Sequence, residues 1–125
     1  MIDLAEILSI HQIVIENFGG LKGLRDEGGL MSALNRPYQT FGGQELYPSP
    51  IEKAAAIFES IISNHPFLDG NKRTAYILLR LTLMDYHYDI KVSETEKYAF
   101  AMKAARGESS FDEIKLRINQ NCATI

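Results

Sequence analysis

Cysteine and tryptophan are nearly absent from this 125-residue chain, which holds one cysteine, Cys122, and no tryptophan. A lone cysteine forms no disulfide within the chain and supplies no cysteine cluster for zinc, so we expect a reducing, cytoplasmic environment. The first residues, MIDLAEILSIHQ, lack the basic segment of a secretion leader, and the apolar runs are far shorter than the ~20 residues that cross a bilayer. We therefore expect neither secretion nor membrane insertion.

An excess of positive charge is missing as well. The chain has 13 lysines and arginines against 16 aspartates and glutamates, a net charge of −3. Proteins that neutralise many backbone phosphates of DNA or RNA need a basic excess, so direct nucleic-acid binding is disfavoured. The chain does have 46% hydrophobic residues and no repeat or linker, which predicts one compact domain over residues 1–125.

Helical periodicity dominates the chain. Apolar residues from Leu4 to Phe18 recur at three- and four-residue spacings until Gly19-Gly20 stops them. Capping residues and the same periodicity predict five more helices: after Asp26 as far as Arg36-Pro37, from about Pro50 to Asn64, from about Asn71 to Tyr88, from Ser93 to Arg106 and from Ser110 to about Asn121. The expected fold class is all-α, with a short extended connection at Asp89 to Val92.

Residues 36–49 form the longest stretch without helical periodicity. Within it, Gly42-Gly43 separates Thr40-Phe41 from Leu46-Tyr47. Two glycines between short runs with strand-forming residues are typical of a tight β-turn. We expect a small β-hairpin or flap here.

The segment HPFLDGNKR, residues 65–73, lies between the two most apolar helices, and a core does not explain its composition. Asp69, Gly70 and Asn71 suit a turn and a helix start. Lys72 and Arg73 then fall in the first helical turn, where the helix dipole repels cations. A bound anion would remove this conflict, because free amides, a glycine and two cationic side chains would all face it. The segment predicts a phosphate site.

A nucleoside triphosphate would give each polar residue a task. His65 can take a proton from an attacking hydroxyl, and Asp69 can hold a magnesium ion that bridges phosphates. Arg73 can bind phosphate oxygens in a bidentate manner, and Asn71 would orient or bind phosphate. Phe67 and Leu68 are expected to turn inward as scaffold.

Several ordinary interpretations compete with this one. The spacing around Gly70 does not fit the common phosphate loop G-x-x-x-x-G-K-[ST]. A histidine before a proline is often structural, and we leave His11 and His87 outside the site as surface or partly buried residues. Lys22 and Arg25 are expected to be solvated loop charges.

The segment HPFLDGNKRTA closely resembles the H-x-F-x-[DE]-G-N-[GK]-R signature of the Fic/Doc superfamily, and NFGGLKGLRDEGGLMSAL, RPYQTFGGQELYP and EKAAAIFESIISN look like its death-on-curing (Doc) branch. The resemblance covers roughly the first ninety residues. It implies a single Fic/Doc domain, a six-helix Fic-like bundle, whose toxins modify a protein hydroxyl with a nucleoside triphosphate such as ATP.

The resemblance also implies residue roles. His65 would be the base, Asp69 would bind Mg²⁺, and the phosphates would be held by Gly70, Asn71 and Arg73. Lys72 is added to the phosphate-binding residues because of its place at the positive end of the helix dipole. The hairpin, with Thr40, Phe41, Gly42 and Gly43, would align the target protein by strand addition.

Two positions bear on which group is transferred. Most adenylyl-transferring Fic proteins have glycine in place of Lys72 and arginine in place of Tyr76. Lys72 resembles Doc, whose implied activity is transfer of the terminal phosphate to a translation elongation factor, whereas Gly70 is the Fic-type residue where Doc has alanine. Phosphoryl transfer is favoured, nucleotidyl transfer is the alternative, and a catalytically silent module that only binds an antitoxin is the third hypothesis.

Regulation is expected to come from a partner. Self-inhibited Fic proteins carry the motif [ST]-x-x-x-E-[GN], and this chain has no intact copy. The resemblance implies a small Phd-like antitoxin in trans, whose disordered C-terminal segment folds as a helix into a groove near the site.

Overall fold

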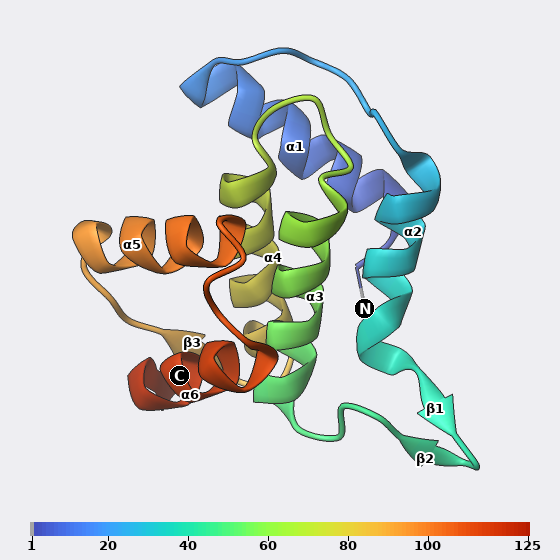
Figure 1. Cartoon of the computed structure of the whole chain (residues 1–125), viewed down its shortest axis with the longest axis vertical. Coiled ribbons are helices and arrows are strands. Elements are labelled where there is room, and N and C mark those ends of the chain that lie inside the picture. Colours follow the sequence, from blue (N-terminus) through green and yellow to red (C-terminus); the bar gives the residue numbers. More distant parts are fainter. Residues whose placement is uncertain (1) are drawn as a thin grey trace.

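The computed structural model describes residues 2–125 (Figure 1). Its helices are α1 (Leu4–Phe18), α2 (Glu27–Asn35), α3 (Pro50–Asn64), α4 (Asn71–Met84), α5 (Glu94–Ala105) and α6 (Phe111–Asn121), with a 3-10 turn at Arg36–Tyr38. Its strands are β1 (Thr40–Phe41), β2 (Gln44–Glu45), β3 (Tyr88–Ile90) and β4 (Cys122–Thr124). The expected all-α class with six helices and a small hairpin is confirmed.

Helices α3 and α4 form the centre of the molecule. They run side by side, and α1 crosses near the end where the α3–α4 loop lies, while α2, α5 and α6 pack around them (Figure 1). Phe58 and Ile61 of α3 and Leu78 and Leu79 of α4 are fully buried. In the part of the chain that the structure describes, no helix has the length and apolarity needed to cross a bilayer.

Side-chain caps fix the starts of most helices. Asp3, Asp26, Ser49, Ser93 and Ser110 each accept a hydrogen bond from the backbone N–H three residues further on. The predicted helix starts are confirmed at these positions. Helix α4 differs, because its N-cap is a glycine and no side chain caps it.

The end of α4 corrects the expected boundary. The helix ends at Met84 and not at Tyr88, since Tyr88 begins β3. Strand β3 pairs antiparallel with β4, with Tyr88 opposite Thr124 and Ile90 opposite Cys122. A partner strand more than thirty residues away outweighs the local helical pattern, and the sequence pattern did not reveal it.

The β1–β2 hairpin is confirmed as an element. Thr40 pairs with Glu45, and Gly42 and Gly43 supply the two positive φ angles, 58° and 80°, that a tight hairpin turn requires. The buried Lys53 on α3 anchors it: Nζ lies 2.8 Å from Oε1 of Glu45 and also donates to the carbonyl of Tyr47.

The hairpin lies away from residues 65–73, although a flap that aligns a target hydroxyl with His65 would have to lie beside them. It lies at the N-terminal end of α3, whereas residues 65–70 follow the C-terminal end (Figure 1). Fifteen helical residues separate the two ends by about 22 Å. A target strand on Thr40 and Phe41 would therefore not lie beside His65.

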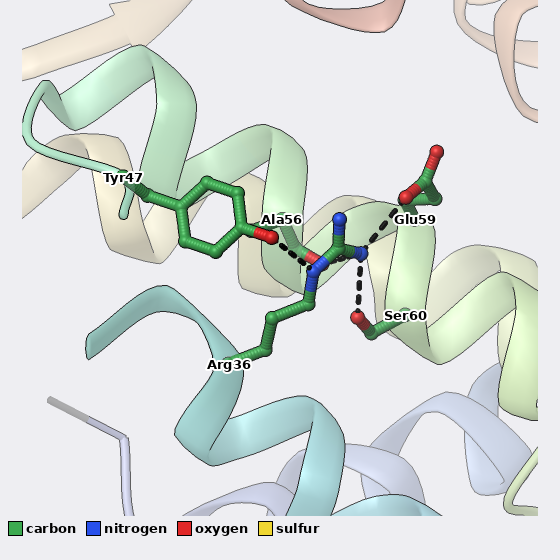
Figure 2. A network of polar contacts seen from close by, with 5 residues as sticks. All are labelled: Arg36, Tyr47, Ala56, Glu59 and Ser60. Carbon is green, nitrogen blue, oxygen red and sulfur yellow. Dashed lines mark hydrogen bonds and ion pairs between the residues drawn. The ribbon is translucent and has the colours of Figure 1, made fainter. Parts of the chain in front are cut away.

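Arg36, directly after α2, forms hydrogen bonds to α3 and to Tyr47 in the segment that precedes α3 (Figure 2). Nε donates to the Tyr47 hydroxyl at 2.9 Å, and Nη1 donates to Glu59 Oε1 at 2.8 Å and to Ser60 Oγ at 3.0 Å. The guanidinium also lies 5.2 Å from the ring centroids of Tyr47 and Phe111. Burial by itself would lower the pKa of Arg36, but the bonds to Tyr47 and Glu59 raise the pKa above its ordinary value. This network connects α2 and α3 with the start of α6.

Candidate phosphate-binding site

The α3–α4 loop has a buried side and an exposed side. Pro66 and Phe67 point into the protein, and Phe67 is only 1% exposed. Leu68 is 45% exposed, so the expectation that it turns inward with Phe67 is wrong. The loop thus has a single aromatic anchor, while His65, Lys72 and Arg73 are exposed.

His65 ends α3 in a left-handed conformation, with φ 50° and ψ 54°. Its carbonyl accepts bonds from Arg25 Nε at 2.9 Å and Arg25 Nη2 at 2.6 Å, and Nη2 also donates to the carbonyl of Asn64 at 2.9 Å. A cation at a helix C-terminus is stabilising. Arg25 is exposed, as expected for a loop charge, but it also holds the backbone of His65, while the His65 side chain remains exposed.

The start of α4 offers free backbone amides. Gly70 is the N-cap, and the first helical bond runs from Thr74 N to Gly70 O at 3.0 Å. The amides of residues 70–73 therefore have no acceptor within the helix. Gly70 has φ 79°, and a Cβ there would lie 3.3 Å from side-chain atoms of Val14 and Ile15. The dihedral angle strongly favours glycine, and a Cβ would also require the Val14 and Ile15 side chains to shift by a few tenths of an ångström.

Lys72 and Arg73 lie in the first turn of α4, as the sequence predicted. Both are exposed, and neither forms an ion pair with any described acid. The Arg73 guanidinium lies 4.2 Å from the ring centroid of Phe18. Two unpaired cations at the positive end of a helix create an electrostatic preference for an anion.

A groove of about 390 Å³ adjoins these two cations. It lies between the end of α1, the first half of α4 and α5, and aromatic residues from all three helices line it: Phe18, Tyr76 and Tyr98. Lys97 of α5 lies 5.4 Å from the Tyr76 ring centroid, and burial is the main cause that raises the pKa of Tyr76. The groove combines apolar walls with a cationic edge.

Asn71 has a different environment from the one the sequence suggested. Its side chain is buried, and Oδ1 accepts from Phe67 N at 3.0 Å while Nδ2 donates to Phe67 O at 2.9 Å. The amide group therefore closes the loop on itself. Any contact between Asn71 and a phosphate would come from its backbone N–H.

Asp69 is bound through its carboxylate and its carbonyl. Oδ2 accepts from Leu21 N at 2.6 Å, and the carbonyl accepts from His11 Nε2 at 2.8 Å. Oδ1 makes no hydrogen bond or ion pair with the residues that the structure describes. Those residues contain no group of three acidic, histidine or cysteine side chains for a metal. Magnesium is commonly held by one or two carboxylates together with phosphate oxygens, so Asp69 suits Mg²⁺ only alongside a phosphate ligand.

The connection between α1 and α2, residues 19–26, lies alongside the loop. Leu68 N donates to Gly23 O at 3.1 Å, Arg25 N donates to Pro66 O at 2.7 Å, and Leu24 forms a β-bridge with Phe67. This segment, and not the hairpin, lies beside the loop. The sequence signal for an unusual backbone conformation in this connection was its three glycines, all of which have positive φ angles.

Sequence reasoning left His11 outside the site, as it did Arg25. It is 6% exposed, and its ring stacks on Phe67 with a centroid distance of 3.7 Å and an interplanar angle of 7°. The signal was its spacing from Ile7 and Val14, which places all three on one face of α1.

The fold and the loop define a class of protein: an all-α domain in which an exposed histidine precedes a helix start with free amides and two unpaired cations. Comparison with known families is consistent with this class. A sequence model of the Fic/DOC family matches residues 1–83, which include the whole loop and the elements that hold it, so this chain belongs to the Fic/DOC family.

One relative is the toxin Doc of Mycolicibacterium smegmatis (strain ATCC 700084 / mc(2)155). It is 41% identical to this chain over 75 residues. The aligned segment covers 60% of this chain and 55% of that toxin. The chain therefore matches about half the length of this relative.

Proposed function

We propose that this protein is a Doc-like toxin that transfers the terminal phosphoryl group of a nucleoside triphosphate to a hydroxyl of another protein. One observation carries the proposal. A short loop joins an exposed histidine, His65, to a helix start with free amides and two unpaired cations, Lys72 and Arg73. A base and an anion cradle on one rigid loop are the two parts that phosphoryl transfer needs.

In the proposed reaction, the His65 ring accepts the proton of the target hydroxyl. The oxygen forms a bond to the terminal phosphorus, the bond from that phosphorus to the bridging oxygen breaks, and the nucleoside diphosphate leaves. The amides of residues 70–73 and the Arg73 guanidinium bind phosphate oxygens. A magnesium ion held by Asp69 would neutralise phosphate charge when bound.

The groove beside Lys72 and Arg73 supports a nucleotide as the phosphate donor. Its aromatic residues Phe18 and Tyr98 are more than 60% exposed, at 62% and 66%, and can stack on a base. ATP is the proposed co-substrate.

Target docking by strand addition is proposed at the α1–α2 connection in place of the hairpin. This segment already forms a β-bridge with the loop, and Leu21 and Lys22 are exposed on it. A strand added there would lie close to His65, which a strand on the hairpin would not.

Labelled ATP tests which group is transferred. The purified protein would be incubated with ATP labelled at the terminal or at the alpha phosphate, and with a lysate or a purified translation elongation factor. Terminal label on protein supports phosphoryl transfer. Alpha label on protein would instead show nucleotidyl transfer, which the Fic-type Gly70 favours and which uses the same residues. If neither label is transferred, both enzyme hypotheses fail, and the third hypothesis, a catalytically silent module that binds an antitoxin, replaces them.

His65→Ala tests the base, and His87→Ala is a matched control. Both histidines are exposed and have positive φ angles, 50° and 67°. The change at His65 should lower the transfer rate by about 10²–10⁴-fold, as expected for a general base, without loss of helical structure. His87→Ala should transfer at the normal rate. Equal rates in the two variants would refute the role of His65.

The proposed partner is a small Phd-like antitoxin that acts in trans in the cytoplasm. The relative from Mycolicibacterium smegmatis is named as a toxin, which supports this part of the proposal. Expression of the chain alone should arrest growth, and co-expression of the adjacent reading frame should relieve the arrest. Normal growth on expression alone would contradict the toxin assignment.

A further inference from the structure

We infer that His11 is a positioning residue for the phosphate-binding loop. His11 belongs to α1, far from the loop in sequence, yet it contacts the loop at two points. Nε2 donates to the Asp69 carbonyl at 2.8 Å, and the ring stacks on Phe67, the buried anchor of the loop. The effect of His11 on catalysis rests on the proposed function, whereas its effect on loop geometry does not.

The direction of the hydrogen bond is fixed by chemistry. A carbonyl oxygen only accepts, so Nε2 of His11 must carry the hydrogen. The peptide between Asp69 and Gly70 is planar and trans, and in such a peptide the N–H points opposite to the C=O. His11 therefore directs the Gly70 N–H away from α1. This amide is one of the four at the start of α4 that have no helical acceptor.

The contact has no substitute. The His11 ring lies beside the turn, so that a Cβ added to Gly70 would be in ordinary van der Waals contact with Nε2, at 3.5 Å. Among the described residues, no other side chain donates to the Asp69 carbonyl. Arg25 performs the corresponding task at the first residue of the loop, where it bonds the His65 carbonyl. The loop is thus fixed at its two ends by side chains from different elements.

A pair of substitutions separates positioning from packing. In His11→Gln, the side-chain Nε2 lies as many bonds from Cα as the Nε2 of histidine, so a donor to Asp69 remains. In His11→Leu, an apolar side chain fills the site without a donor. Both remove the stacked ring, so a purely structural role would affect the two variants alike.

The first measurement is the rate of phosphoryl transfer at saturating Mg-ATP, on variants shown to be folded by thermal unfolding. His11→Leu should lower kcat by about 10–100-fold, since a displacement of about 1 Å at a reacting centre has effects of this size. His11→Gln should recover most of the loss, and KM for the protein target should not change. Equal rates of His11→Leu and the unmodified protein, or of the two variants, would overturn the inference.

The second measurement is hydrogen exchange, which needs no enzymatic activity. The amide of Phe67 is bonded to Asn71 Oδ1 at 3.0 Å, and the amide of Leu68 to Gly23 O at 3.1 Å. Both should exchange faster in His11→Leu than in His11→Gln, while amides in the middle of α3 stay equally protected.

If the unmodified protein transfers no label, the proposed function fails, and the exchange rates still decide whether His11 positions the loop. Unchanged protection of Phe67 and Leu68 in His11→Leu would refute the positioning role.

Discussion

Replacing Arg25 with methionine tests whether the C-terminal end of α3 is stabilised by a side chain from outside the helix. Methionine keeps most of the side-chain length and removes the charge and all three hydrogen bonds to the carbonyls of Asn64 and His65. Those bonds oppose a conformational cost, because a left-handed conformation disfavours a non-glycine residue such as His65 by about 1–2 kcal/mol. We expect both stability and catalysis to fall.

The expected loss of stability follows from the exposure of Arg25. A cation at a helix C-terminus contributes about 0.3–1 kcal/mol, and hydrogen bonds from a charged donor contribute somewhat more. Water competes for an exposed guanidinium, so we expect a loss of about 1–2 kcal/mol in the free energy of unfolding. For a domain of this size, that loss lowers Tm by roughly 4–8 °C. The rate of phosphoryl transfer should also fall, by about 10–100-fold, because the His65 backbone is no longer fixed.

Arg106→Met is the matched control. Arg106 is an exposed arginine at the C-terminal end of α5, and its side chain forms no hydrogen bond or ion pair with the described residues. Thermal unfolding and label transfer would be measured on both variants. If Arg25→Met behaves like Arg106→Met in both assays, the bonds of Arg25 to the end of α3 have no role. If Tm falls and kcat does not, Arg25 stabilises α3 without positioning His65.

Three further predictions concern single side chains. Arg73→Ala should weaken Mg-ATP binding, measured by calorimetry, about 10-fold, which is the loss of about 1.4 kcal/mol expected for one charge-assisted contact. The exposed Arg106→Ala is the control, and equal affinities of the two variants would contradict the phosphate role of Arg73. Gly70→Ala should lower the free energy of unfolding by about 1–2 kcal/mol, because φ is 79°, and an unchanged denaturant midpoint would contradict this strain. The third prediction concerns the pH dependence of stability. The hydrogen bonds that Arg80 donates to Asp89, at 3.0 and 2.8 Å, lower the pKa of Asp89. The resulting stabilisation is fully present above the unfolded-state pKa of ~3.9 and is lost as the pH falls through the lower folded-state pKa. Tm of Asp89→Asn should therefore fall less with acid below about pH 4 than Tm of the unmodified protein, and an equal fall in both proteins would refute this role of Asp89.

The parts of the fold that local chemistry encodes were predictable. Ser49, Pro50 and Glu52 specify a helix start within four residues, and α3 begins and ends where the pattern indicated. The hairpin was predictable in the same way, because a Gly42-Gly43 turn allows few alternatives. The position of Lys72 and Arg73 in the first turn of α4 also followed from spacing alone.

Long-range contacts account for what the sequence did not reveal. Strand β3 depends on β4, and the bonds of His11 and Arg25 to the loop join residues 58 and 40 positions apart. Asn71 shows a subtler limit. Its sequence context correctly indicates a special loop, but only the structure shows that its side chain bonds within the loop and faces no open space.

The separation between the hairpin and the loop has a practical consequence for labelling. Gly42 and Gly43 are exposed, and nothing lies within 4 Å of where their side chains would be. Exposed turns of this kind tolerate inserted residues. An epitope or fluorophore-binding tag placed between these two glycines would report the location and abundance of the protein in cells, about one helix length away from His65.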